Sequence, residues 1–147
     1  MRKALAAALC LVLLAASGTA LAEKTVTLTF VGDCTLGGED WLINREGSFH
    51  DYARKEGYTY FFEKMRDFFS EDDLTIINFE GVLKDDSRDA VNKTYCFRGP
   101  TDFARILPLS SIEAVNLDNN HTLDYGKRGK TSTVEALTGA GVHVFDE

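Results

Sequence analysis

Two amides, an imidazole and a carboxylate stand close together where an apolar run of the chain ends. Residues 112–117 are followed by Asn119, Asn120, His121 and Asp124. A strand ending in a loop fixes such groups at the carboxyl edge of a sheet, where α/β proteins place ligands. Amide oxygens bind cations, imidazole titrates near neutral pH, and a carboxylate orients an imidazole or binds a cation. The stretch predicts a site; the alternative is an ordinary turn, because Asn, Asp and Gly also turn the chain.

Two other apolar runs end in polar residues in the same way. Residues 25–31 alternate between polar and apolar types, which predicts a strand with one buried face, and Asp33 follows. Residues 74–79 are nearly all apolar, which predicts a strand buried on both faces, with Asn78 and Glu80 at its end. All three polar groups therefore fall at the carboxyl ends of predicted strands.

The segments between these runs predict helices that hold the strands in layers. Aromatic and apolar residues recur at helical spacing over residues 59–69, and Thr101 can cap a helix that Pro108 ends. A further helix is expected over residues 130–138 and a last strand over 142–145. We expect a mobile loop at 84–93 and a solvated loop around His50. Alternating strands and helices predict an α/β layered domain.

The first 22 residues have the pattern of a secretory signal peptide. Arg2 and Lys3 precede an apolar core, and Ala20-Leu21-Ala22 is a small-residue cleavage pattern. We therefore expect residues 23–147 to form a secreted or cell-envelope protein without a transmembrane segment after cleavage. Loss of Arg2 and Lys3 would change the formal net charge from −7 to −9. That acidity argues against nucleic acid or an anionic membrane as partner and is compatible with cation binding.

Two cysteines, Cys34 and Cys96, would remain after processing. Each lies near a predicted site segment. In an oxidising compartment they could form one disulfide, and the sequence does not decide between a disulfide and free thiols.

Four sequence blocks, taken in order, resemble one protein family. Residues 30–33 read Phe-Val-Gly-Asp, 76–81 read Ile-Ile-Asn-Phe-Glu-Gly, 95–100 read Tyr-Cys-Phe-Arg-Gly-Pro, and 119–126 read Asn-Asn-His-Thr-Leu-Asp-Tyr-Gly. They resemble the GD, NLEG, Y-x-F-R-G/A-P and NNHxxDYG motifs of the bacterial capsule-synthesis CapA family, which includes the PgsA component of poly-γ-glutamate synthesis. The resemblance runs from about Val26 to Val144.

The CapA family is similar in its core to calcineurin-like metallophosphoesterases, which have a layered αββα sandwich with metal ions at strand ends. By this resemblance a divalent metal (Mn, Mg, Fe or Zn) is implied, and His121 is implied to be the general acid. The residue roles implied are metal ligation by Asp33, Glu80 and Asn120, catalysis by His121 and Asp124, and substrate binding by Asn78, Asn119 and Arg98.

The chain also departs from the phosphoesterase pattern. Thr35 stands where those enzymes carry a histidine, the GDxxD motif is replaced by residues 78–81, and His143 alone does not supply the later HxH pair. We therefore expect no complete two-metal centre in these residues, and we interpret the chain as the N-terminal half of a CapA-like domain.

Two functions remain open at this stage. The first is a secreted CapA-like protein of capsule or poly-γ-glutamate synthesis that acts as a metal-dependent, phosphoesterase-like hydrolase. The alternative is a non-catalytic module that binds a cation or polymer and assists a membrane synthase. The expected partner is an anionic extracellular polymer or that synthase.

Overall fold

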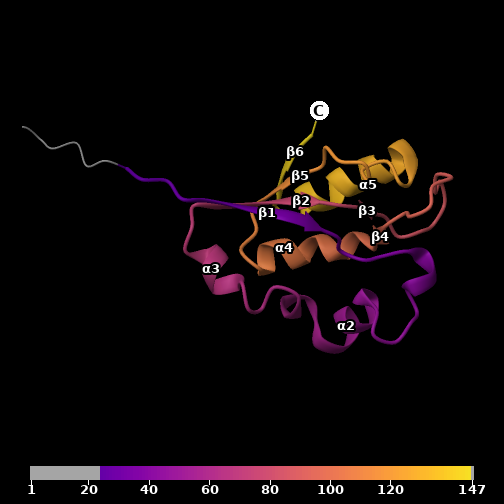
Figure 1. Cartoon of the computed structure of the whole chain (residues 1–147), viewed down its shortest axis with the longest axis horizontal. Coiled ribbons are helices and arrows are strands. Elements are labelled where there is room, and N and C mark those ends of the chain that lie inside the picture. Colours follow the sequence, from indigo (N-terminus) through magenta and orange to yellow (C-terminus); the bar gives the residue numbers. More distant parts are fainter. Residues whose placement is uncertain (1–23, 147) are drawn as a thin grey trace, which may run out of the picture.

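A four-stranded parallel sheet is the main structural unit (Figure 1). The computed structural model describes residues 24–146, and the predicted signal peptide lies outside them. The strand order is β1 (Leu28–Cys34), β2 (Leu74–Phe79), β5 (Ala114–Asn116) and β6 (His143–Phe145), with every neighbouring pair parallel. The predicted α/β class is confirmed.

Helices and a second, two-stranded sheet lie between these strands. The α-helices are α2 (Phe49–Glu56), α3 (Arg66–Ser70), α4 (Ile106–Leu109) and α5 (Gly126–Gly139), and the 3₁₀ helices are η1 (Asp40–Leu42), η2 (Tyr58–Tyr60) and η3 (Thr101–Arg105). The small sheet pairs β3 (Val82–Leu83) with β4 (Arg98–Gly99).

The core lies on one face of the four-stranded sheet. Ile77 of β2 and Val115 of β5 pack in one buried cluster with Phe69 of α3, Leu107 of α4 and Leu137 of α5. Each crossover connects a strand to its next neighbour in the same direction along the sheet. Because such crossovers share one hand, they place their helices on the same face.

The opposite face of the sheet is open within residues 24–146. Along β2, partly exposed and buried residues alternate, so only one face of this strand is fully buried. On the open face of β1, Leu28 is 48% exposed and Phe30 72% exposed. The expectation that β2 is buried on both faces is therefore wrong for the described residues.

The segment around His50 is a helix rather than the expected solvated loop. The Ser48 side chain caps α2 by accepting a hydrogen bond from Asp51 N at 3.1 Å, and Gly57, at φ 81°, ends the helix. Ser48 followed by Asp51 is a sequence signal for a helix start that the spacing of apolar residues does not show. His50 is 7% exposed, and its ring lies 5.1 Å from that of Phe103.

Two other helices differ from their predicted limits. The helix expected over residues 59–69 is interrupted, so that η2 is followed by turns and α3 begins only at Arg66. In the interrupted part, Phe61 stacks on Phe49 with ring centroids 3.8 Å apart, so tertiary packing overrides the helical spacing. Pro108 lies inside α4 instead of ending it, because proline is tolerated in the first turn of a helix.

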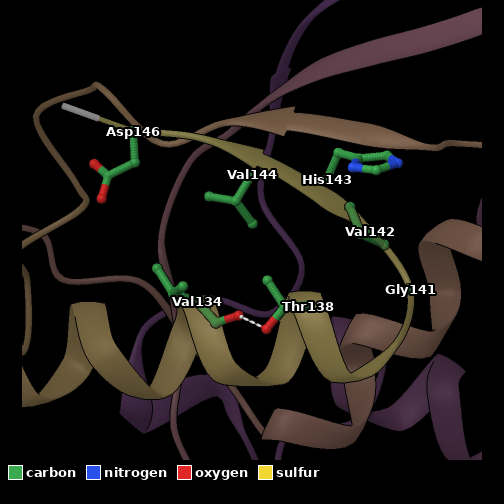
Figure 2. A pocket seen from close by; sticks show the side chains of 7 residues that line it. All are labelled: Val134, Thr138, Gly141, Val142, His143, Val144 and Asp146. Carbon is green, nitrogen blue, oxygen red and sulfur yellow. Dashed lines mark hydrogen bonds between the residues drawn. The ribbon is translucent and has the colours of Figure 1, made fainter.

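Strand β6 is an edge of the sheet within the described residues. Figure 2 shows a pocket between β6 and α5, and none of the predicted site residues lines it. Among residues 24–146, no helix has the length and apolar character needed to cross a bilayer.

Replacing Thr133 by valine should destabilise the protein. The Thr133 hydroxyl is buried, accepts a hydrogen bond from Leu83 N at 2.9 Å and donates to Gly129 O at 2.8 Å, so it joins α5 to β3. Thr133→Val keeps the shape but leaves a buried N–H unpaired, which costs about 1–3 kcal/mol. Urea unfolding should show this loss. Thr138→Val is the control, because the exposed Thr138 side chain bonds only within α5. An equal loss in both variants would contradict the assignment.

His50 should make stability depend on pH below about 6.5. Burial lowers the pKa of His50 below its usual value, and the charges of Arg98 and Arg54 lower it further. The unfolded chain takes up a proton below about pH 6.5. Stability should therefore be complete above that pH and fall as the pH drops toward the lower pKa of the folded state.

Thermal unfolding at several pH values checks this expectation. His50→Phe should flatten the dependence in that window, whereas His143→Gln, at an exposed histidine of β6, should leave it unchanged. A wild-type curve that stays flat as the pH falls below about 6.5 would contradict the expectation.

Candidate functional site

Polar side chains from three neighbouring strands meet at the carboxyl edge of the sheet. Asp33 of β1 lies opposite Asn78 of β2, and Asn78 lies opposite Asn116 of β5. Glu80 follows β2 directly, and its backbone N–H donates to Cys34 O at 3.0 Å. The parallel register thus brings together side chains that are far apart in the sequence.

An irregularity in β1 decides which way Asp33 points. The register with β2 shifts between Phe30 and Asp33, so that strand β1 carries one extra residue there. Strict alternation would place Asp33 on the same face as Val31, which packs against the core. The extra residue moves Asp33 to the open face, beside Asn78, as a β-bulge does.

Asn78 connects β1 to the loop that follows β5. Its Nδ2 donates to Asp33 Oδ1 at 2.6 Å, while its Oδ1 accepts from Asn116 Nδ2 at 3.0 Å and Asn119 Nδ2 at 3.1 Å. Asn119 Nδ2 also donates to Phe79 O, and Asn119 Oδ1 accepts from His121 N, both at 2.9 Å. The two amides predicted to bind substrate are therefore engaged in holding the His121 loop against the strand end.

His121 stands between two carboxylates. Its Nδ1 lies 2.7 Å from Asp124 Oδ2, and its Nε2 lies 3.6 Å from Glu80 Oε1. The Phe97 ring stacks on the imidazole, with centroids 4.4 Å apart and planes 22° from parallel. An ionised carboxylate only accepts hydrogen bonds, so the short contact to Asp124 places a proton on Nδ1. The other ring nitrogen, Nε2, faces Glu80.

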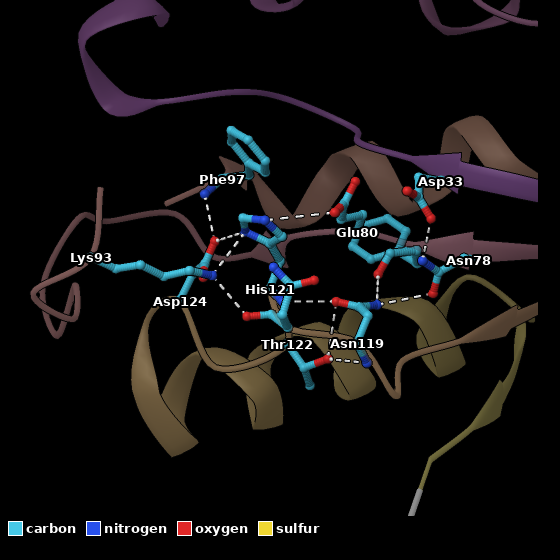
Figure 3. Close-up of polar contacts among 11 residues, drawn as sticks. Asp33, Asn78, Glu80, Lys93, Phe97, Asn119, His121, Thr122 and Asp124 are labelled. Carbon is cyan, nitrogen blue, oxygen red and sulfur yellow. Dashed lines mark hydrogen bonds and ion pairs between the residues drawn. The ribbon is translucent and has the colours of Figure 1, made fainter. Parts of the chain in front are cut away.

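Asp124 is almost fully buried, with its side chain 1% exposed. Its Oδ1 accepts from Lys93 Nζ at 2.9 Å, and its Oδ2 accepts from Phe97 N at 2.8 Å. The backbone N–H of Val91 donates to Asp124 O at 2.9 Å. The segment after β3, expected to be mobile up to residue 93, is thus tied to the loop that carries His121. Figure 3 shows these side chains following one another from Lys93 to Asp33.

The site also includes three residues that the sequence did not single out: Lys93, Phe97 and Asn116. Phe97 lies inside the block of residues 95–100 that carried a family resemblance, and that block was the available signal. Asn116 is the last residue of β5, just before the polar stretch. A single lysine in a polar, Asp-rich segment gives no signal in the sequence.

Arg98 and Asn120 lie at the margins of the site. The Arg98 guanidinium is buried, donates from Nε to Asp40 Oδ1 at 2.8 Å, and donates from Nη1 to Lys84 O at 2.7 Å. Asp40 also accepts from the Tyr125 hydroxyl at 3.1 Å. Through Asp40, Arg98 is linked to Tyr125, which follows Asp124 in the chain, so Arg98 supports the His121 loop indirectly. Asn120 is exposed, and its backbone oxygen accepts from Lys93 Nζ at 2.8 Å.

The predicted metal ligands are two carboxylates and one amide. Asp33 and Glu80 supply carboxylate oxygens and Asn120 an amide oxygen, which suits hard divalent cations such as Mg²⁺ or Mn²⁺. Within residues 24–146, no three side chains of His, Cys, Asp or Glu are gathered so that they hold a metal ion by themselves. The metal site therefore stays a prediction that needs further oxygen ligands.

Neither cysteine takes part in a disulfide in the described residues. Burial raises the pKa of Cys34 to about 11, with a further contribution from the Asp33 charge. Burial also raises the pKa of Cys96. Both thiols are thus protonated at neutral pH, and in that form neither is a strong nucleophile or metal ligand.

Comparison with known proteins supports the motif assignment. Residues 27–145 match the model of the bacterial capsule synthesis protein family PGA_cap. Over 70 residues, the chain is 39% identical to proteins of Mycobacterium tuberculosis strains CDC 1551 / Oshkosh and H37Rv, each described as a probable polyglutamine synthesis accessory protein. The alignment covers 48% of this chain and 18% of each relative. The chain belongs to the bacterial capsule synthesis protein family PGA_cap.

Proposed function

We propose that this protein is an exported accessory component of capsule or poly-γ-glutamate synthesis, and that its strand-end site is a metal-dependent hydrolase centre. The observation that carries the proposal is the His121–Asp124 pair, with Nδ1 to Oδ2 at 2.7 Å and Nε2 facing Glu80. The mycobacterial relatives are described as probable polyglutamine synthesis accessory proteins, which supports an accessory role in polymer synthesis.

The residues of the site have distinct roles in this proposal. In its charged form the His121 ring carries a second proton, on Nε2, which it gives to a leaving group, while Asp124 orients the ring and stabilises that charged form. Asp33 and Glu80, with the oxygen of Asn120, would hold a divalent cation. Such a cation would polarise a phosphoryl or carbonyl oxygen of the substrate. Asn78 and Asn119 keep the two halves of the site in register.

A binding module without catalysis is the second candidate. It is supported by the description of the mycobacterial relatives as probable accessory proteins of synthesis. In that case the same edge would hold a cation that bridges the acidic protein to carboxylates of the polymer. Metal binding without turnover would support this second function.

Substitution at His121 should separate the two functions. Removal of a general acid typically costs roughly 10²–10⁴-fold in rate. In the full-length protein loaded with Mn²⁺, His121→Gln should reduce hydrolysis of a chromogenic phosphodiester by that factor and leave Mn²⁺ binding within roughly twofold. Asp118→Asn, at an exposed carboxylate of the same loop, is the matched control and should retain full turnover.

Substitution at Asp33 should act on the metal. Asp33→Asn removes a charged ligand and should weaken Mn²⁺ binding, measured by calorimetry, by roughly tenfold or more, because a hard cation prefers a carboxylate. A chelator should abolish wild-type turnover, and added Mn²⁺ should restore it. A wild-type protein that neither binds Mn²⁺ nor hydrolyses the phosphodiester would overturn the enzyme proposal.

A further inference from the structure

Lys93 is the cation nearest to the His121–Asp124 pair in the described residues. It lies between β3 and β4, and its side chain is 32% exposed. Its Nζ donates to Asp124 Oδ1 at 2.9 Å and to Asn120 O at 2.8 Å, and it lies 3.3 Å from His121 Nδ1. The ammonium group therefore contacts the carboxylate, the loop backbone and the imidazole together.

Donors from two segments determine the orientation of the Asp124 carboxylate. Lys93 Nζ bonds to Oδ1, while Phe97 N at 2.8 Å and His121 Nδ1 at 2.7 Å bond to Oδ2. A buried carboxylate oxygen without a donor is costly. Without the ammonium, Oδ1 would lose its partner, and the carboxylate would gain by turning toward other donors. Lys93 thus keeps Oδ2 directed at the imidazole.

The contacts also decide between the two neutral forms of the imidazole. With a proton on Nε2, the Nδ1 lone pair would face Asp124 Oδ2 at 2.7 Å with no hydrogen between them. That arrangement is repulsive, although the Nδ1 lone pair would then accept from Lys93 at 3.3 Å. With the proton on Nδ1, the ring donates a hydrogen bond to Asp124 Oδ2 and Nε2 carries the lone pair. The second form therefore replaces the repulsion by a hydrogen bond.

We propose that Lys93 is a positioning residue, which fixes the carboxylate of Asp124 so that His121 keeps its proton on Nδ1 and presents the Nε2 lone pair toward Glu80. The Phe97 ring stacks on the imidazole and limits rotation of the His121 ring. The tautomer follows from these contacts alone. Its effect on turnover rests on the proposed hydrolase function.

Nitrogen NMR of the His121 ring in the full-length protein tests the tautomer directly. At a pH where the imidazole is neutral, the wild type should show a protonated Nδ1 and an unprotonated Nε2. Lys93→Met, which keeps the apolar stem but no charge, should give a mixture of both forms, and Lys93→Arg should restore the wild-type pattern. Arg88→Met removes a cation that pairs with Asp86 in the same loop, and it should change nothing.

Hydrogen exchange provides a second readout. The Phe97 amide bonds to the carboxylate that Lys93 fixes, so Lys93→Met should speed its exchange roughly tenfold or more, as expected for loss of a charged hydrogen bond. If the substituted protein does not fold, Lys93→Gln, which keeps a donor, replaces it in both measurements. A wild type with the proton on Nε2, or a Lys93→Met protein with unchanged tautomer and exchange, would overturn the proposal.

Turnover separates this proposal from the proposed function. Where the wild type hydrolyses phosphodiester, Lys93→Met should lower kcat with little change in KM, and Lys93→Arg should recover most of it. A wild type without turnover would contradict the hydrolase function alone, because the NMR result would still decide the role of Lys93.

Discussion

A buried carboxylate must be paired, and Asp124 imposes this constraint on the site. Its side chain is 1% exposed, and its donors come from residues 93–97 and from His121. Leaving such a group unpaired would cost several kcal/mol. Satisfying it brings the segment between β3 and β4 onto the loop after β5, and the same contacts orient the imidazole. Asp124 thereby both holds two segments of the chain together and orients the imidazole of the site.

The opposite end of the site depends on the geometry of the sheet. The extra residue in β1 directs Asp33 to the open face, and Asn78 joins it to the loop through its side-chain amide. The open face also carries exposed Leu28 and Phe30. The carboxylates, amides and imidazole thus lie along one sheet edge, with the helices on the far side.

The sequence predicted the features that follow from local patterns. Apolar runs predicted strands β1, β2, β5 and β6, and the polar residues at the ends of three of them indicated Asp33, Asn78, Glu80 and the His121 loop. The face of the sheet to which Asp33 points could not be predicted, because a bulge in β1 changes the alternation of side chains between the two faces without changing the composition. Helix α2 was missed because its Ser48 cap, rather than apolar spacing, marks it. Lys93 was missed because its role depends on a contact with Asp124, 31 residues away.

The most direct test of this account is the coupling between Lys93 and Asp124 in the free energy of unfolding. Urea unfolding of the wild type, Lys93→Met, Asp124→Asn and the double variant gives a double-mutant cycle on the full-length protein. The account predicts a coupling of about 1.5–3 kcal/mol, as for a hydrogen bond between charged groups in a largely buried site. Additive effects within about 0.5 kcal/mol would contradict it and leave Lys93 a surface residue without a part in the site.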